Sequence, residues 1–200
     1  MPSAPTMFTG RARLTGRSLL ACLVLLTPLC GAATAAATND PAHASRSADT
    51  GARITAVRKL DARTLDLTVQ SPAMGRSVPV RVILPKCWHS EGRRTFPTVY
   101  MLHGGEDDYT SWTRETDVET LAEDSDALVV MPDGGKYGYY SDWYVGTPRW
   151  ETFHTTELVQ LMERTFRANS SRAVIGLSMG ASARSTTRRV IGECSGTWRP

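Results

Sequence analysis

The chain has 200 residues, enough for one domain, and a formal net charge of +3 from 23 basic and 20 acidic residues. The basic excess lies at the two ends: residues 1–37 hold three arginines and no acid, and residues 181–200 hold four arginines and one glutamate. The middle is mildly acidic, with 16 basic against 19 acidic residues, and this excludes nucleic acid as an expected partner.

Residues 1–37 have the pattern of a secretory signal peptide. Three arginines precede the apolar run 19–26, and the alanine-rich residues 31–37 follow it. The apolar run is too short for a membrane span. We therefore expect cleavage after residue 35 or 37, no stable membrane span, and a secreted, extracellular product.

Residues 38–52 are rich in Ala, Ser, Thr and Asp and have no periodicity, which predicts a disordered linker. Order is expected to begin near Ile54. Apolar and polar residues alternate over 64–69 and again over 78–84, with a turn at 71–75 between them. This pattern predicts an antiparallel hairpin at the start of the folded domain.

Three later apolar runs predict strands. Residues 96–102 and 127–131 are apolar on both faces and end in glycine-containing turns, as buried parallel strands do, and residues 173–176 form a third run. Helices are expected over 116–123 and, with an amphipathic pattern, over 150–166. The alternation predicts an α/β fold with a mostly parallel sheet behind the N-terminal antiparallel hairpin.

The last apolar run leads directly into Gly176-Leu177-Ser178-Met179-Gly180. A G-x-S-x-G at a strand end holds its serine on a sharp turn and exposes the hydroxyl. A serine hydroxyl is a weak nucleophile, so such a site also needs a base and donors for the oxyanion. The pattern nominates Ser178 as a catalytic nucleophile.

A second glycine-rich turn, His103-Gly104-Gly105, follows the strand 96–102. Glycines there let backbone N–H groups face a developing oxyanion, so we expect the N–H groups of Gly105 and Met179 to form the oxyanion hole. The alternative is that the two glycines only make a tight turn. His103 precedes the serine and is expected to have a structural role in its loop.

Other conspicuous residues have simpler interpretations. The stretch Asp133-Gly134-Gly135 is expected to be only a turn, and His154 is expected at the surface of its helix. The cluster Asp142-Trp143-Tyr144 either lines a substrate cleft or packs against the body of the domain.

From Ser71 to Gly180 the chain resembles the secreted esterase family of α/β-hydrolases, which includes esterase D, feruloyl esterases and the antigen 85 mycolyltransferases. The resemblance rests on six stretches in order: SPAMGR at 71–76, VYMLHGG at 99–105, DDY at 107–109 with Trp112, YSDWY at 140–144, WETF at 150–153 and GLSMG at 176–180.

The resemblance implies an α/β-hydrolase fold and acyl-ester hydrolysis or acyl transfer through an acyl-serine, with neither metal nor organic cofactor. The implied substrate is a small-molecule, glycolipid or carbohydrate ester. Ser178 matches the family nucleophile, and Gly105 and Met179 match its oxyanion donors. Mycolyltransferases carry an arginine in the loop where this chain has Gly105-Glu106, so a general esterase fits better than trehalose chemistry.

The end of the chain departs from the family pattern. No histidine follows Ser178 and the only later acid is Glu193, whereas the fold places its acid and then its histidine after the nucleophile. Back-translation with one base lost near the Gly180 codon restores small, aromatic and helix-forming residues, so residues 181–200 are expected to be out of frame. Residues 53–180 would then be the N-terminal part of a hydrolase domain, truncated and inactive. The alternative is a non-catalytic secreted domain that binds carbohydrate or lipid.

Overall fold

The structure is a computed structural model that describes residues 46–183. The expected signal peptide and most of the expected out-of-frame tail lie outside the described residues. The described strands are β1 (Arg53–Lys59), β2 (Thr64–Ser71), β3 (Arg76–Ile83), β4 (Phe96–Leu102), β5 (Leu128–Pro132) and β6 (Ala168–Gly176). The helical segments are α2 (Ser111–Glu115), α3 (Val118–Ala122), α4 (Trp150–Thr152), the π-helical turn η1 (Phe153–Glu157) and α5 (Leu158–Thr165).

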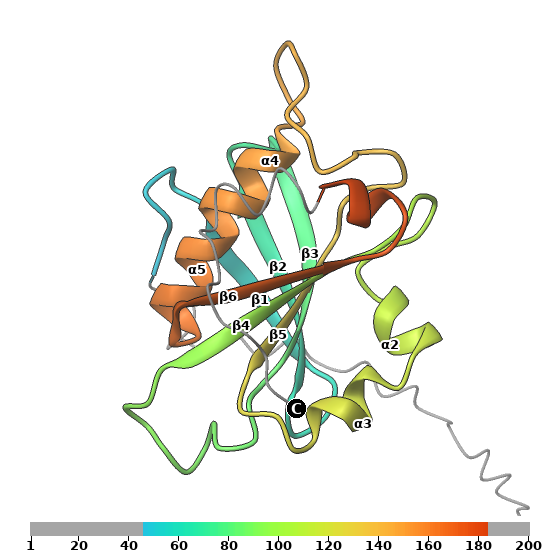
Figure 1. Ribbon diagram of the computed structural model, residues 1–200. Helices are drawn as coiled ribbons and strands as arrows, with labels where there is room; N and C mark the ends of the chain where they lie inside the picture. The colour runs from blue at the N-terminus through green and yellow to red at the C-terminus, as the bar shows by residue number, and fades with distance from the viewer. Residues whose placement is uncertain (1–45, 184–200) are drawn as a thin grey trace, which may run out of the picture. The chain divides into compact units, whose positions relative to one another are not determined.

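The strands form one mixed sheet in the order β1-β2-β3-β5-β4-β6 (Figure 1). Strands β5, β4 and β6 are parallel, as the sequence predicts. The antiparallel part is larger than the predicted hairpin, because β1 pairs with β2 and β3 pairs with β5, both antiparallel. Strand β1 escaped prediction because it lies at the sheet edge, where four of its seven side chains are exposed and charged residues interrupt the apolar pattern.

Both faces of the sheet are covered, which explains the unbroken apolar runs of the central strands. Leu128 and Val130 of β5 join the large core beneath α4, η1 and α5, whereas Val129 and Met131 point the other way. These two residues pack with Val118 and the rest of a smaller core beneath α2 and α3. The helical segment expected over 150–166 is therefore confirmed in extent, although its centre is a π turn.

The expected linker is partly wrong, because residues 46–52 pack against the domain. Ala48 and Ala52 are buried in the large core, and Asp49 forms an ion pair with Arg164 of α5, with Oδ1 2.6 Å from a guanidinium nitrogen. Order therefore begins by residue 46, before the expected Ile54. The alanines that made this stretch look featureless are the residues that fit beneath the helix.

A buried carboxylate joins this segment to the sheet. Glu157 of η1 is fully buried and accepts hydrogen bonds from Thr50 Oγ1 at 2.9 Å and from the Ala73 N–H at 3.0 Å. The Ser71 hydroxyl donates to its other oxygen. One side chain thus satisfies donors from the start of the domain and from the turn between β2 and β3.

No helix within residues 46–183 has the length and apolar character needed to cross a membrane.

We predict that Glu157→Ala lowers the free energy of unfolding by about 3 kcal/mol, because it leaves two buried donors, the Ser71 hydroxyl and the Ala73 N–H, without an acceptor. Urea denaturation followed by circular dichroism measures the change. Glu123→Ala is the matched control, since Glu123 is exposed at the end of α3, and it should shift stability by less than about 0.5 kcal/mol. Equal effects of the two substitutions would contradict the network.

Candidate active site

The candidate site lies where three parallel strands end. The carboxyl ends of β4, β5 and β6 meet at one edge of the sheet, and Leu102 of β4 is in register with Gly176 of β6. The two turns singled out in the sequence, His103-Gly104-Gly105 and Gly176–Gly180, therefore leave the sheet side by side. This edge is where open α/β sheets bind ligands.

The nucleophile turn is strained and closely packed. Ser178 is exposed and has a φ of +50°, a left-handed conformation that non-glycine residues rarely adopt. A Cβ on Gly176 would lie 2.2 Å from the Gly180 carbonyl oxygen, and one on Gly180 would lie 2.4 Å from the Leu102 carbonyl oxygen. The glycines of the motif are thus required by contact between backbones.

Hydrogen bonds hold this turn against β4. The Leu177 N–H donates to the Leu102 carbonyl at 3.1 Å, and the Gly180 N–H donates back to the Leu177 carbonyl at 2.9 Å. The Ala181 and Ser182 N–H groups donate to the Ser178 carbonyl at 2.9 and 3.1 Å, which starts a helical turn. The Met179 N–H lies at the beginning of that turn, where N–H groups have no partner within the helix.

The second turn lies against the serine. A Cβ on Gly104 would be 3.6 Å from the Cβ of Ser178. The N–H groups of Gly105 and Met179 take part in none of the turn, loop or cap hydrogen bonds among residues 46–183. Gly104 thus lies close to Ser178, and both expected oxyanion donors are free of these hydrogen bonds.

The next residue, Glu106, connects this turn to the loop after β5. It has a φ of +63°, and its N–H donates to the Lys136 carbonyl at 2.9 Å. The Tyr137 hydroxyl donates to its carboxylate, and this hydrogen bond raises the pKa of Tyr137. The side chain of the residue after Gly105 is therefore tied to Tyr137.

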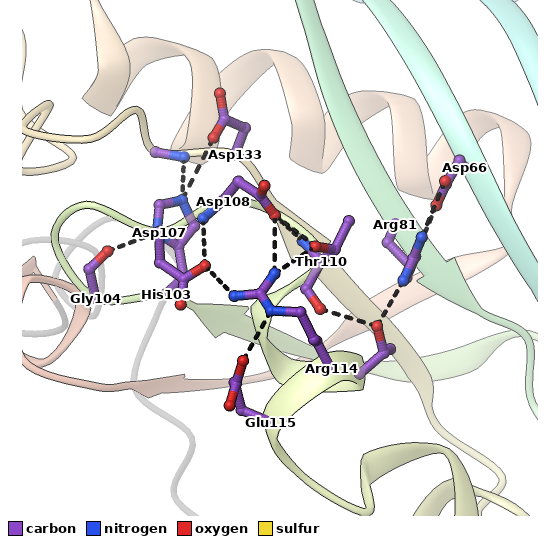
Figure 2. A network of polar contacts seen from close by, with 12 residues as sticks. Asp66, Arg81, His103, Gly104, Asp107, Asp108, Thr110, Arg114, Glu115 and Asp133 are labelled. Carbon is purple, nitrogen blue, oxygen red and sulfur yellow. Dashed lines mark hydrogen bonds and ion pairs between the residues drawn. The ribbon is translucent and has the colours of Figure 1, made fainter.

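His103 is buried, as a structural residue should be, with 1% of its surface exposed. Its Nδ1 lies 2.7 Å from the Gly104 carbonyl oxygen, and the Gly134 N–H donates to its Nε2 at 2.8 Å. Burial by itself would lower the pKa of His103. The Asp133 carboxylate, 3.5 Å from Nε2, and the Gly104 carbonyl have the larger opposite effect, so the pKa is raised. Figure 2 shows the ring between Gly104 and Asp133.

The stretch Asp133-Gly134-Gly135 is more than the simple turn expected from sequence. Besides the hydrogen bond from Gly134 to His103, the ring of Tyr140 lies so close that a Cβ on Gly134 would be 2.4 Å from it. The Tyr140 hydroxyl donates to the His103 carbonyl at 3.0 Å. Only the glycine pair hinted at such close packing in the sequence.

The expectation of a surface position for His154 is wrong. His154 is 3% exposed, with Nδ1 2.6 Å from the Trp150 carbonyl oxygen and Nε2 3.0 Å from the Asp133 carbonyl oxygen. Burial lowers its pKa to about 4. Residue 154 lies four positions after the buried Trp150, on the face of the helical segment that packs against the sheet.

An ion-paired cluster supports the loop that follows Glu106. The guanidinium of Arg114 contacts Asp107 Oδ1 at 2.6 Å, Thr110 Oγ1 at 2.9 Å and Glu115 Oε1 at 2.7 Å (Figure 2). Its hydrogen bond with Asp107 is the main cause that raises the pKa of Arg114. One arginine therefore connects the acidic stretch after Gly105 to helix α2, and this cluster belongs to the scaffold.

The cluster Asp142-Trp143-Tyr144 divides into two roles. Asp142 accepts hydrogen bonds from Thr152 N–H at 2.9 Å and Thr152 Oγ1 at 2.6 Å, and so ties the loop to α4. Trp143 is 56% exposed and Tyr144 fully exposed, on the loop that projects before α4 (Figure 1). The packing interpretation is therefore wrong for the two aromatic residues.

None of the histidines in residues 46–183 is positioned to act as the general base for Ser178. The histidines in residues 46–183 are His89, His103 and His154, and the last two are buried with both ring nitrogens occupied. His89 lies in the loop that leads to the amino end of β4, at the opposite edge of the sheet from Ser178. Within the same residues, no three His, Cys, Asp or Glu side chains gather in a way that could hold a metal ion.

Comparisons with known proteins agree with this geometry. A family model described as "Putative esterase" matches residues 71–183, more than half of the chain. Esterase Rv1288 of Mycobacterium tuberculosis is 37% identical over 142 residues, covering 68% of this chain and 31% of that protein. The diacylglycerol acyltransferase/mycolyltransferase Ag85B of Mycobacterium leprae is 38% identical over 129 residues, covering 58% of this chain and 37% of that protein. The chain thus spans about a third of the length of these relatives.

Solved structures show the same fold. An S-formylglutathione hydrolase from Agrobacterium tumefaciens superposes with a TM-score of 0.58 at 20% identity, over 67% of this chain and 56% of that one. A ferulic acid esterase gives a TM-score of 0.53 at 24% identity, over 62% of this chain and 52% of that one. The predicted α/β-hydrolase fold is confirmed.

We predict that Gly180→Ala destabilises the domain by about 3 kcal/mol, because the new methyl group would press on the backbone of Leu102 rather than on a movable side chain. The midpoint of urea unfolding measures it. Gly92→Ala is the control: Gly92 is exposed and a Cβ there meets nothing within 4 Å. A tolerated Gly180→Ala would contradict the close approach of the two turns.

A pH dependence follows from His154. Its pKa falls from 6.5 to about 4 on folding, so between these values the unfolded chain binds a proton that the native state excludes. Stability should therefore drop as pH falls through this window, by up to about 1.4 kcal/mol per pH unit. Denaturation at several pH values should show this slope in the parent and in His89→Gln, which alters an exposed residue, but a smaller slope in His154→Gln.

Proposed function

Because the chain belongs to this esterase family, we propose that it provides the nucleophile and the oxyanion hole of a serine-dependent acyl-ester hydrolase or acyltransferase. Ser178 is the nucleophile, and the backbone N–H groups of Gly105 and Met179 are the oxyanion donors. The observation that carries the proposal is the exposed, left-handed Ser178 beside Gly104, with both N–H groups outside the hydrogen bonds of the turns.

The proposed chemistry follows from these groups. The Ser178 hydroxyl attacks the ester carbonyl carbon, its proton passes to a base, and the carbonyl oxygen becomes an anion that accepts hydrogen bonds from the two N–H groups. Collapse of this intermediate expels the alcohol and leaves an acyl-serine. Water or a second alcohol then takes the acyl group. These steps need neither a metal nor an organic cofactor.

Glu106 supports a choice of substrate class. Glu106 directly follows Gly105 in the chain, and its carboxylate is hydrogen-bonded to Tyr137. A negative charge next to the reacting carbonyl disfavours anionic esters. We propose neutral small-molecule, glycolipid or carbohydrate esters, and general ester hydrolysis in preference to the mycolyl transfer named in the Ag85 relatives. Export is part of the proposal and is supported by the pattern of residues 1–37.

The same geometry supports slow turnover for this chain by itself. A serine without a general base must lose its proton to solvent, and triad members act as a unit. The buried positions of His103 and His154 leave neither able to serve Ser178. A non-catalytic domain that binds carbohydrate or lipid is the second candidate, and the exposed Trp143 and Tyr144 favour it.

A fluorophosphonate probe tests the proposal. We predict slow modification at Ser178, identified by peptide mass spectrometry, with a rate that rises about ten-fold per pH unit because hydroxide replaces the missing base. Ser178→Ala should abolish labelling of this peptide. A plateau near neutral pH would reveal a base that the proposal lacks. A folded but unlabelled protein would favour the binding function, which tryptophan fluorescence titration with soluble glycans or lipid vesicles would then examine.

A further inference from the structure

The position of His103 suggests a task beyond filling space. Its carbonyl, its ring and the following glycine connect the loops after β4 and β5, and each contact is made to backbone or to a buried side chain. We infer that His103 is a positioning residue that sets the direction of the Gly105 N–H, and so pre-orients half of the oxyanion hole. This inference rests on the proposed function.

The argument begins with the peptide between Gly104 and Gly105. Among residues 46–183 only the Thr147–Pro148 bond is cis, so this peptide is trans and its C=O and N–H point in opposite directions. His103 Nδ1 holds the Gly104 carbonyl at 2.7 Å. Fixing that carbonyl fixes the N–H of Gly105 on the other side of the same rigid plane. Without this contact, two successive glycines would leave the plane free to rotate.

The tautomer of the ring is set by the opposite nitrogen. The Gly134 N–H donates to Nε2 at 2.8 Å, so Nε2 offers a lone pair and the proton of the neutral ring is on Nδ1. The Nδ1–H then donates to the Gly104 carbonyl. Gly134 thereby controls, through His103, a peptide that it does not touch directly.

The ring itself is held in place from two sides. The ring of Tyr140 meets it edge-on with centroids 5.8 Å apart, and the Tyr140 hydroxyl bonds its backbone carbonyl. Because Tyr140 fills the space above Gly134, the contact between Gly134 and Nε2 is held at short range. Packing and hydrogen bonds therefore act together on the orientation of one N–H group.

Two conservative substitutions separate the halves of this arrangement. An asparagine amide nitrogen can occupy the place of Nδ1, so His103→Asn keeps the donor to Gly104 and loses the acceptor for Gly134. A glutamine amide oxygen can occupy the place of Nε2, so His103→Gln keeps the acceptor and loses the donor. A role in packing alone would make the two variants alike.

The direct test is nuclear magnetic resonance on the whole chain. The residual dipolar coupling of the Gly105 N–H, which reports the direction of that bond, should match the parent in His103→Asn and differ in His103→Gln. Amide exchange of Gly134 should show the reverse pattern, with about five-fold acceleration in His103→Asn. An unchanged Gly105 coupling in His103→Gln would overturn the inference.

The unaltered protein provides a test that does not depend on the variants' folding. At pH 8.5, long-range proton–nitrogen spectra should show His103 with its proton on Nδ1, and a proton on Nε2 instead would overturn the inference. Labelling of Ser178 by the fluorophosphonate should be slower in His103→Gln than in His103→Asn by about ten-fold. If labelling fails in every form while the spectra behave as expected, the proposed chemistry is wrong and the positioning role stands.

Discussion

The candidate site depends on the direct contact between the nucleophile turn and the carboxyl end of β4. No side chain fits between Gly180 and the Leu102 backbone, or between Gly176 and Gly180 within the turn. Ser178, between these glycines, has a left-handed conformation at the sheet edge. The register of β4 with β6 then places the two turns next to each other. The close contact of Gly180 with Leu102 requires a residue without a side chain at position 180. The hydrogen bond from the Leu177 N–H to the Leu102 carbonyl holds the nucleophile turn against β4.

Buried polar side chains on one helical segment connect the rest of the domain to this edge. Glu157 and His154 both lie on the π turn η1, where Glu157 binds the chain before β1 and the turn after β2, and His154 binds the loop after β5. Glu157 is satisfied by hydroxyl groups and a backbone N–H, which is the condition for burying polar atoms without a large loss of stability. The neutral ring of His154 donates to one of the two carbonyl oxygens beside its nitrogens. Both residues are buried within this π turn, and π turns are frequent at functional sites.

The site parts that we propose for the described domain belong to backbone and strand ends. Ser178 and the N–H groups of Gly105 and Met179 are placed by local turns and by β4 and β6, so they are present in a chain that spans about a third of its relatives' length. The general base is a side chain that the fold places later in the sequence. The nucleophile turn and the backbone donors can therefore form without the general base. This explains why the turn is complete although neither His103 nor His154 can act as the base for Ser178.

The sequence by itself determined the five strands with clear apolar patterns, the helical segment over 150–166 and the nucleophile motif, because periodicity and glycine spacing are local properties. Its six family-like stretches indicated the α/β-hydrolase fold. It did not determine β1, whose pairing depends on a neighbouring strand, nor the packing of residues 46–52. The contact of His154 with Asp133 joins residues 21 positions apart, and the linkage of His103 to Gly134 joins residues 31 positions apart. Tertiary structure decided these features because hydrogen bonds between distant backbone groups leave no periodic mark in the sequence.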